Sequence, residues 1–165
     1  MTYEKQLQEL IVKAHWRKYN LYNSVIVFDI EQDDRREIFY QYLAKTSWRK
    51  FQSDQHKAGN DNYDYVLFDD EVLTVLRLYN ALKQHNEKIL IFNNDTVIRK
   101  SGLLGIIEGG VCNNPETFNK WYVNPEGKQK FMFKGSIIIL TSLTQIEFLK
   151  KKKYEWLMRD CQKIW

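Results

Sequence analysis

Short apolar runs that alternate with helix-patterned segments dominate the chain. Four of these runs predict strands, because each is short, rich in β-branched or aromatic residues, and bounded by polar residues. Hydrophobicity within the runs is continuous rather than alternating, which indicates that both faces of each strand are covered. The predicted strands are residues 24–30, 65–68, 88–92 and 136–141.

Segments with helical spacing lie between the runs. Asp34 followed by Glu37 forms a variant of the capping box ahead of one apolar stripe. Asp70 stands where an N-cap residue would precede a second stripe, which runs to about His85. Further helices are predicted at residues 7–14 and 103–107 and from residue 144 onward.

The order of these elements predicts the fold class. Strands that alternate with helices favour a parallel sheet covered on both faces, which is an α/β three-layer sandwich. We expect four or five strands, the fifth from residue 162, within a single domain at residues 1–165. One stretch breaks the alternation: residues 121–123 and 131–133 flank a Pro- and Gly-containing turn and predict a hairpin.

Ligands of open α/β sheets bind beyond the carboxyl ends of the strands, so the residues at these ends are candidates for chemistry. All four ends are polar, and acids or amides are found at three of them. The sequences there are Asp29-Ile-Glu31, Asp69-Asp70-Glu71, Asn93-Asn94-Asp95 and Thr141-Ser142.

Composition narrows the class of protein. Hydrophobic residues make up 44% and charged residues 28%, as in soluble globular proteins, and 25 basic against 21 acidic residues give a net charge of only +4. No apolar run is long enough to span a bilayer, and no signal peptide is recognisable. The two cysteines suggest no disulfide scaffold. We therefore expect a cytoplasmic protein without a membrane partner. Three scattered histidines predict no zinc site; we expect them on the surface or partly buried.

From about Val72 onward the chain resembles a known family. The run Lys88-Ile-Leu-Ile-Phe-Asn-Asn-Asp95, the residues 101–104, and the stretch Phe131-Met-Phe-Lys-Gly135 leading into Ser136-Ile-Ile-Ile-Leu-Thr-Ser142 carry the resemblance. They resemble the core of the P-loop AAA+ ATPases that occur in phages and plasmids. In that family the strand ending at Asn93 would be the Walker B strand, the strand ending at Ser142 the sensor-1 strand, and an Arg near Arg159 the finger that reaches a neighbouring subunit.

The departures from the family pattern concern its catalytic elements. A Walker A loop needs glycines and a lysine to hold phosphates, yet the turn after the first strand reads Asp29-Ile-Glu-Gln-Asp-Asp34, whose four carboxylates repel a triphosphate. Asn93 and Asn94 replace two acids, and Ser142 replaces an asparagine. We also expect no lid domain. The resemblance therefore implies a pseudo-ATPase without a cofactor, which binds a protein partner such as a related ATPase or a replication component.

Two enzymatic alternatives stay open. Asp29 and Glu31 lie two residues apart on a strand, where they could share Mg²⁺, and the Phe-Asp-Ile-Glu run is similar to the first motif of proofreading exonucleases. A magnesium-dependent nuclease would need further carboxylates, for which Asp69 is one candidate. The other alternative is a divergent ATP-binding protein that holds nucleotide by unusual contacts.

Two features bear on partners. Lys150, Lys151, Lys152 and Lys153 form the single charge run. They are either a solvated helix turn or, together with nearby aromatic residues, a contact for nucleic acid. Aromatic residues make up 15% of the chain, so we expect either a large aromatic core or an exposed aromatic patch that binds a protein or a second copy of the chain.

Overall fold

The computed structural model describes part of the chain. The described residues are 2, 5, 8–9, 25–29, 35–52, 62–69, 73–93, 100, 102–103, 105–107, 120–123, 130–141 and 162–164. For some of these residues the backbone alone is described, namely residues 25–29, 35, 120–123, 130, 132, 141 and 162–164.

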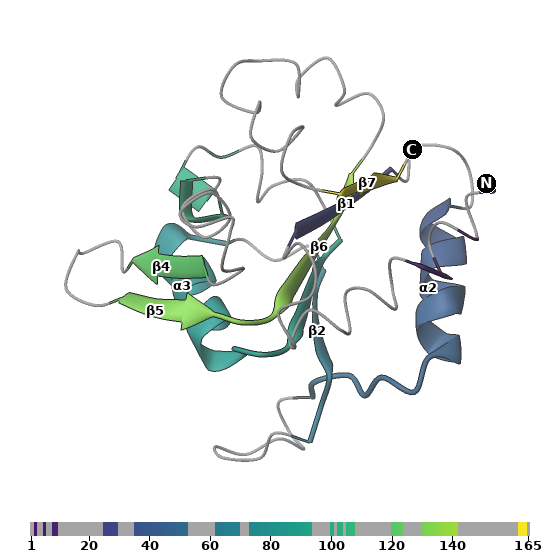
Figure 1. Ribbon diagram of the computed structural model, residues 1–165, viewed down its shortest axis with the longest axis horizontal. Coiled ribbons are helices and arrows are strands. Elements are labelled where there is room, and N and C mark those ends of the chain that lie inside the picture. Colours follow the sequence, from purple (N-terminus) through teal and green to yellow (C-terminus); the bar gives the residue numbers. More distant parts are fainter. Residues whose placement is uncertain are drawn as a thin grey trace.

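Five strands form one sheet in which every neighbouring pair is parallel (Figure 1). The sheet order is β2-β3-β6-β1-β7. The continuous apolar runs therefore form strands as predicted, and the α/β class with a parallel sheet is confirmed. The strands are β1 (Val25–Asp29), β2 (Tyr65–Phe68), β3 (Ile89–Phe92), β6 (Ser136–Thr141) and β7 (Gln162–Ile164).

Two helices lie on opposite sides of this sheet (Figure 1). Helix α2 (Arg35–Lys45) connects β1 to β2, and helix α3 (Val75–Gln84) connects β2 to β3. The first connection runs across the sheet in one direction and the second returns in the other. Since crossover connections between parallel strands are right-handed, opposite directions place the two helices on opposite faces.

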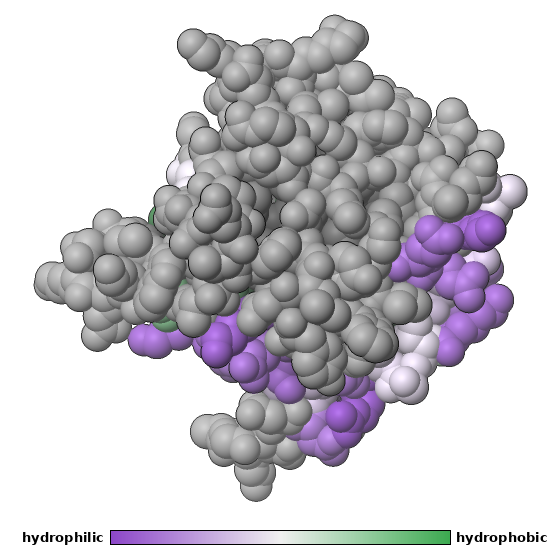
Figure 2. All heavy atoms as spheres, in the orientation of Figure 1, coloured by the Kyte–Doolittle hydropathy of each residue, from purple (hydrophilic) through white to green (hydrophobic). Residues whose placement is uncertain are grey.

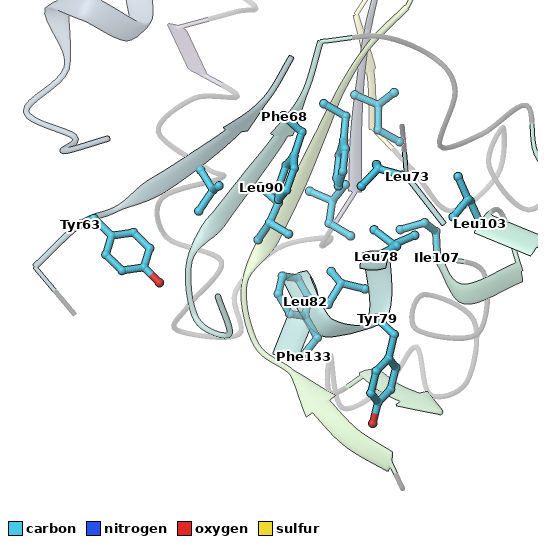
Figure 3. Packing of buried hydrophobic residues seen from close by; sticks show 14 residues of the cluster. Tyr63, Phe68, Leu73, Leu78, Tyr79, Leu82, Leu90, Leu103, Ile107 and Phe133 are labelled. Atoms are coloured by element: carbon cyan, nitrogen blue, oxygen red, sulfur yellow. The ribbon is translucent and has the colours of Figure 1, made fainter. Parts of the chain in front are cut away.

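The two faces of the sheet carry separate hydrophobic clusters. Successive side chains of a strand point to opposite faces of the sheet, so β3 and β6 together contribute four side chains to each cluster. Figure 3 shows Leu78 and Leu82 of α3 directed toward the sheet, near Leu90 and Phe133. Facing α3 are Leu90, Phe92, Ile137 and Ile139; facing α2 are Ile89, Ile91, Ile138 and Leu140. Each such side chain contributes about 1.5–3 kcal/mol by burial.

The start of α3 differs from the prediction. Thr74 is the N-cap residue of α3. Its backbone is extended, and its side chain accepts a hydrogen bond from the Arg77 amide at 3.2 Å, so the helix begins directly after it. The prediction that Asp70 caps this helix is wrong, because a threonine four residues later offers an equally good acceptor just ahead of the apolar stripe. Asp70 itself lies outside the described residues.

A two-stranded antiparallel ribbon precedes β6, which confirms the predicted hairpin. It consists of β4 (Lys120–Val123) and β5 (Lys130–Phe133). Phe131 packs edge-on against Tyr79 of α3 at 5.2 Å between ring centroids, and Phe133 is fully buried. The chain then bends at Gly135, where a Cβ atom would overlap the Lys88 carbonyl oxygen. The bend therefore requires glycine.

A short segment covers part of the outer edge of β2, which is the last strand on its side of the sheet. Lys50 bridges to Tyr65 in parallel orientation, the Phe51 amide donates to the Tyr65 carbonyl at 2.8 Å, and the Tyr65 amide donates to the Arg49 carbonyl at 3.2 Å. Both backbone groups of Tyr65 that face away from β3 are thereby paired.

The other predicted helices are described only in part. Residues 5, 8 and 9 are helical at the beginning of the chain, as are residues 102–103 and 105–107, whereas the helix predicted from residue 144 lies outside the described residues. Across the described ranges, no helix has the length and apolar character needed to cross a membrane.

The described surface is mainly polar. Figure 2 shows hydrophilic side chains over α2 on the face drawn. Leu76 of α3, at 45% exposure, is the one large hydrophobic side chain classed as exposed among the residues with described side chains. Trp48 packs against the cluster under α2. The described aromatic side chains thus belong to the core or its border, and Trp16, Trp156 and Trp165 lie outside the described residues.

Candidate functional site at the carboxyl edge of the sheet

The carboxyl ends of β3, β6 and β1 lie side by side, because these strands are neighbours in the sheet. Asp29 at the end of β1 pairs in register with Thr141 at the end of β6. From β1 the chain proceeds to β2, and from β6 it proceeds to β7 on the opposite side. Such a reversal between adjacent strands is where open α/β sheets bind ligands. We call the edge marked by Asp29, Asp69, Asn93 and Thr141 the carboxyl edge.

Asn93 is the best-defined polar side chain at the carboxyl edge. Its backbone amide continues the ladder by donating to the Phe68 carbonyl at 2.9 Å, and its side-chain Nδ2 donates to Oδ1 of Asp69 at 2.5 Å. The opposite orientation of the amide would set its oxygen against the carboxylate, so the hydrogen bond fixes which atom points where. Two neighbouring strands are therefore joined just beyond their ends.

The Asn93 side chain is only partly satisfied. The residue is 8% exposed, and its buried Oδ1 has no hydrogen-bond partner among the residues that the structure describes. A buried acceptor without a donor costs about 1–3 kcal/mol. The Asn93 side chain therefore uses its NH₂ group, but not its oxygen, in hydrogen bonds with the described residues.

Asp69 lies at the surface, unlike Asn93. Its side chain is exposed and accepts the hydrogen bond from Asn93. Two strands, β3 and β6, separate β2 from β1, so Asp69 and Asp29 end strands that are about 14 Å apart at the usual strand spacing. Metal ions of a two-metal site lie about 3.5–4 Å apart, which counts against Asp69 and Asp29 as ligands of one such site. Within the described part of the chain, no group of three His, Cys, Asp or Glu residues could hold a metal ion.

Most of the other candidate residues are outside the described part. The structure brings Asn93 and Asp69 together and places Asp29 at the same edge by its backbone. Glu31, Asn94, Ser142, Lys150, Lys151, Lys152, Lys153 and Arg159 lie outside the described residues, so their predicted roles stay predictions.

A second polar cluster lies at the opposite edge of the sheet, where β2 and β3 begin. Tyr63 and His85 share a buried hydrogen bond of 2.7 Å between the hydroxyl oxygen and Nδ1. Lys88 donates from Nζ to the Tyr63 carbonyl at 2.8 Å, and its ammonium group lies 4.5 Å from the centroid of the Tyr63 ring. Phe51 packs edge-on against both the Tyr63 and the His85 rings, at 4.9 and 4.8 Å. We call these four residues the amino-edge cluster.

Burial, with a smaller contribution from the nearby Lys88 charge, lowers the pKa of His85 to about 4. The imidazole is therefore neutral at pH 7. His85 is 4% exposed, so the expectation of a surface or partly buried side chain is wrong for this histidine. The signal in the sequence was its position directly after the apolar stripe of α3, but the residue that covers it, Phe51, is 34 positions away in the chain.

The backbone around the amino-edge cluster is also paired. Oδ1 of Asn86 accepts from the amides of Glu87 at 3.0 Å and Lys134 at 2.8 Å. The Ser136 amide donates to the Lys88 carbonyl at 3.1 Å, which ties the start of β6 to the start of β3. These contacts hold the strands together at their beginnings, where no ligand site is expected.

Comparison of the chain with protein-family models, with curated proteins and with solved structures found no match.

Proposed function

We propose that the chain is a non-hydrolytic pseudo-ATPase domain that serves as a protein-binding or regulatory module. The observation that carries this proposal is Asn93. At the position that corresponds to Walker B in the AAA+ resemblance, the side chain is an amide whose NH₂ group donates to Asp69. A side chain engaged in this way contributes neither the negative charge that holds Mg²⁺ nor the carboxylate that polarises water.

The arrangement of strands supports the resemblance behind the proposal. An ATPase of this type needs the ends of its phosphate-loop, Walker B and sensor-1 strands close together, because all three act on one nucleotide. The strands at the corresponding positions, β1, β3 and β6, are neighbours in the sheet. The finer fold assignment, a P-loop-like three-layer sandwich without a lid, is part of the proposal.

The first strand supports the loss of the reaction. A nucleotide in such a fold would place its phosphates at the end of β1, and this strand ends with Asp29. Three further acids follow within five residues, at Glu31, Asp33 and Asp34, and glycine and lysine are missing from this stretch of sequence. Negative phosphates next to such a segment are repelled, most strongly where water is excluded.

The partner and the biological setting follow from the resemblance. Relatives of this kind occur in phages and plasmids, so we place the chain in a mobile element and in DNA metabolism. A related ATPase or a replication component is the proposed partner, and contact with nucleic acid through Lys150–Lys153 is part of the same proposal. No cofactor is required for a binding role.

A thermal unfolding experiment with Mg²⁺ and ATP tests the proposal. A ligand that binds only the folded state at about 100 times its dissociation constant adds about 2.7 kcal/mol of stability. We expect no change in Tm with Mg·ATP or Mg·ADP, and no release of phosphate. A clear rise in Tm with Mg·ATP would overturn the pseudo-ATPase and favour the divergent ATP-binding alternative.

A parallel assay addresses the nuclease alternative. We expect no Mg²⁺-dependent cleavage of single-stranded DNA by the protein. Cleavage that Asp29→Ala and Glu31→Ala both abolish, and that Asp69→Ala leaves intact, would replace the proposal with a nuclease centred on β1.

A further inference from the structure

Residues 49–51 cover both the outer edge of β2 and the buried ring of His85. They lie beside the start of β2 (Figure 1), where the Phe51 amide donates to the Tyr65 carbonyl at 2.8 Å. The Phe51 ring packs edge-on against the His85 ring at 4.8 Å between centroids. One residue thus pairs with the sheet through its backbone and covers the imidazole with its side chain. We propose that residues 49–51 form a pH-sensitive strap, which separates from β2 when His85 is protonated while the rest of the sheet stays folded.

The strap is attached to the sheet over a short length. Its pairing with β2 is a single bridge, between Lys50 and Tyr65. The Arg49 carbonyl accepts from the amides of Asp64 at 2.7 Å and Tyr65 at 3.2 Å, and Oδ2 of Asp64 accepts from the Arg49 amide at 2.7 Å. Arg49 and Lys50 are exposed, and Phe51, the one apolar side chain of the strap, is half-buried. Opening therefore withdraws little apolar surface from the core, which is typical of segments that open without global unfolding.

The surroundings of His85 favour its neutral form. The residue is 4% exposed, and burial, with a smaller contribution from the Lys88 charge, lowers its pKa to about 4. The Tyr63 hydroxyl lies 2.7 Å from Nδ1 and can either donate or accept, so this hydrogen bond serves both forms of the ring. Protonation is thus opposed by the exclusion of water and by Lys88.

The other charged groups on the surrounding elements do not compensate an imidazolium. Arg49 of the strap and Asp64 at the start of β2 pair with each other at 3.3 Å. Lys50 of the strap is exposed, as are Lys83 and Glu87, which flank His85 along the chain. Among the described side chains, no carboxylate forms an ion pair with the His85 ring. A proton on this ring is therefore accommodated best by contact with water.

Movement of the strap supplies that contact. An imidazole in water has a pKa of about 6.5, whereas the pKa of the covered ring is about 4. The open form therefore binds the proton more tightly, and the ratio of open to closed molecules should rise about 20-fold between pH 7 and pH 5. This range lies above the ordinary pKa of a carboxyl group, about 4, so the change belongs to histidine.

Native-state hydrogen exchange measures the opening directly. The amides of Phe51 and Tyr65 are protected by hydrogen bonds that break when the strap leaves β2. We expect their opening constants, corrected for intrinsic exchange rates, to rise about 20-fold from pH 7 to pH 5. We also expect them to exceed those of Ile91 and Ile138 in the centre of the sheet, and to be almost independent of low urea, because a local opening exposes little surface.

Three variants connect the opening to His85. His85→Gln should remove the pH dependence of exchange at Phe51 and Tyr65. Phe51→Ala uncovers the ring and should raise the pKa of His85, followed by NMR of the imidazole, by at least about one unit. Trp48→Ala is the matched control, because Trp48 comes from the same connection but packs against the cluster under α2, and it should leave the titration of His85 unchanged.

Several outcomes would overturn the proposal. They are exchange of Phe51 and Tyr65 with the same urea dependence as the central strands, equal opening constants at pH 7 and pH 5, and an unchanged His85 titration in Phe51→Ala. If a variant does not fold, exchange in the unsubstituted protein still decides between local and global opening. None of these results bears on ATP binding, so the strap and the pseudo-ATPase can fail separately.

Discussion

The two ends of the sheet are built differently. At the amino edge, Tyr63, His85 and Lys88 contact one another and Phe51 closes over their rings, so the strands begin in a packed and paired environment. At the carboxyl edge, one hydrogen bond joins Asn93 to Asp69, and the described part of the chain offers no donor to the buried oxygen of Asn93.

This difference in hydrogen bonding indicates that the two edges have different roles. Paired polar groups and close packing stabilise the fold, whereas an unsatisfied buried acceptor costs stability unless a ligand or partner supplies the donor. The amino edge therefore holds the strands in place, and the carboxyl edge is where we expect binding. Four predictions test this division, from the largest expected effect to the smallest.

Gly135→Ala should cause the largest loss of stability. The added Cβ atom would meet the backbone carbonyl of Lys88, which cannot move without separating β6 from β3. We expect the free energy of unfolding to fall by about 3 kcal/mol or more in urea titrations. Gly105→Ala is the matched control, because nothing lies within 4 Å of its added Cβ atom. A loss in Gly135→Ala as small as in this control would show that the junction at the amino edge adapts easily.

Acidification should cause the second-largest loss of stability, through His85 at the amino edge. His85 has a pKa of about 4 in the folded protein and about 6.5 when unfolded, so the unfolded chain binds more protons between these values. The contribution of His85 to the free energy of unfolding is complete above pH 6.5. As the pH falls toward 4 it decreases by up to about 1.4 kcal/mol per pH unit, for a total loss of about 3 kcal/mol.

Urea titrations at several pH values of the protein and of His85→Gln measure this contribution. The difference between the two pH profiles isolates His85 from the carboxylates, which titrate near the lower end of the window. Parallel profiles would mean that the imidazole can be protonated in place and that the amino edge is less tightly closed than its contacts indicate.

Tyr63→Phe should cost less, about 2 kcal/mol in the free energy of unfolding at pH 7. The change keeps the ring that packs against Phe51 but removes the hydroxyl that pairs with Nδ1 of His85 in a buried site. Tyr42→Phe on α2, whose ring is half-buried, is the control and should change stability little. If the two variants unfold at the same urea concentration, the hydrogen bond at the amino edge contributes nothing net.

Changes at Asn93 should have the smallest effects, and their order is informative. Asn93→Asp places a carboxylate against Asp69 and removes the donor, so we expect a loss of about 1–2 kcal/mol at pH 7 that diminishes in acid. Asn93→Leu removes the hydrogen bond and also the unsatisfied oxygen, so its effect should be within about 0.5 kcal/mol of zero. A loss in Asn93→Leu that matches Tyr63→Phe would erase the contrast between the two edges.

The strands were predictable because their signal is local. The runs at β2 and β6 agree in bounds with the prediction, and β3 starts one residue later than predicted. β1 covers residues 25–29 of the predicted 24–30, and residues 24 and 30 lie outside the described residues. A strand that is buried on both faces requires a continuous apolar run, so these runs predicted the parallel sheet. The start of α3 was mispredicted, since Asp70 and Thr74 are both good N-cap residues and packing of the stripe selects between them.

The candidate site was predictable only as a set of strand ends. That Asn93 contacts Asp69 depends on β2 and β3 being neighbours, and that Asp29 is far from Asp69 depends on two strands lying between β1 and β2. The burial of His85 depends on Phe51, which arrives from a distant segment. Such facts are set by strand order and tertiary packing, which no local pattern encodes.

The segment paired with Tyr65 also affects how copies of the chain can associate. An open outermost strand is a template on which another chain can add its own strand, a common route to aggregation. Here residues 49–51 already occupy the outward amide and carbonyl of Tyr65. The sheet is thereby closed to further growth at this position, and intermolecular extension from there would first require that segment to peel away.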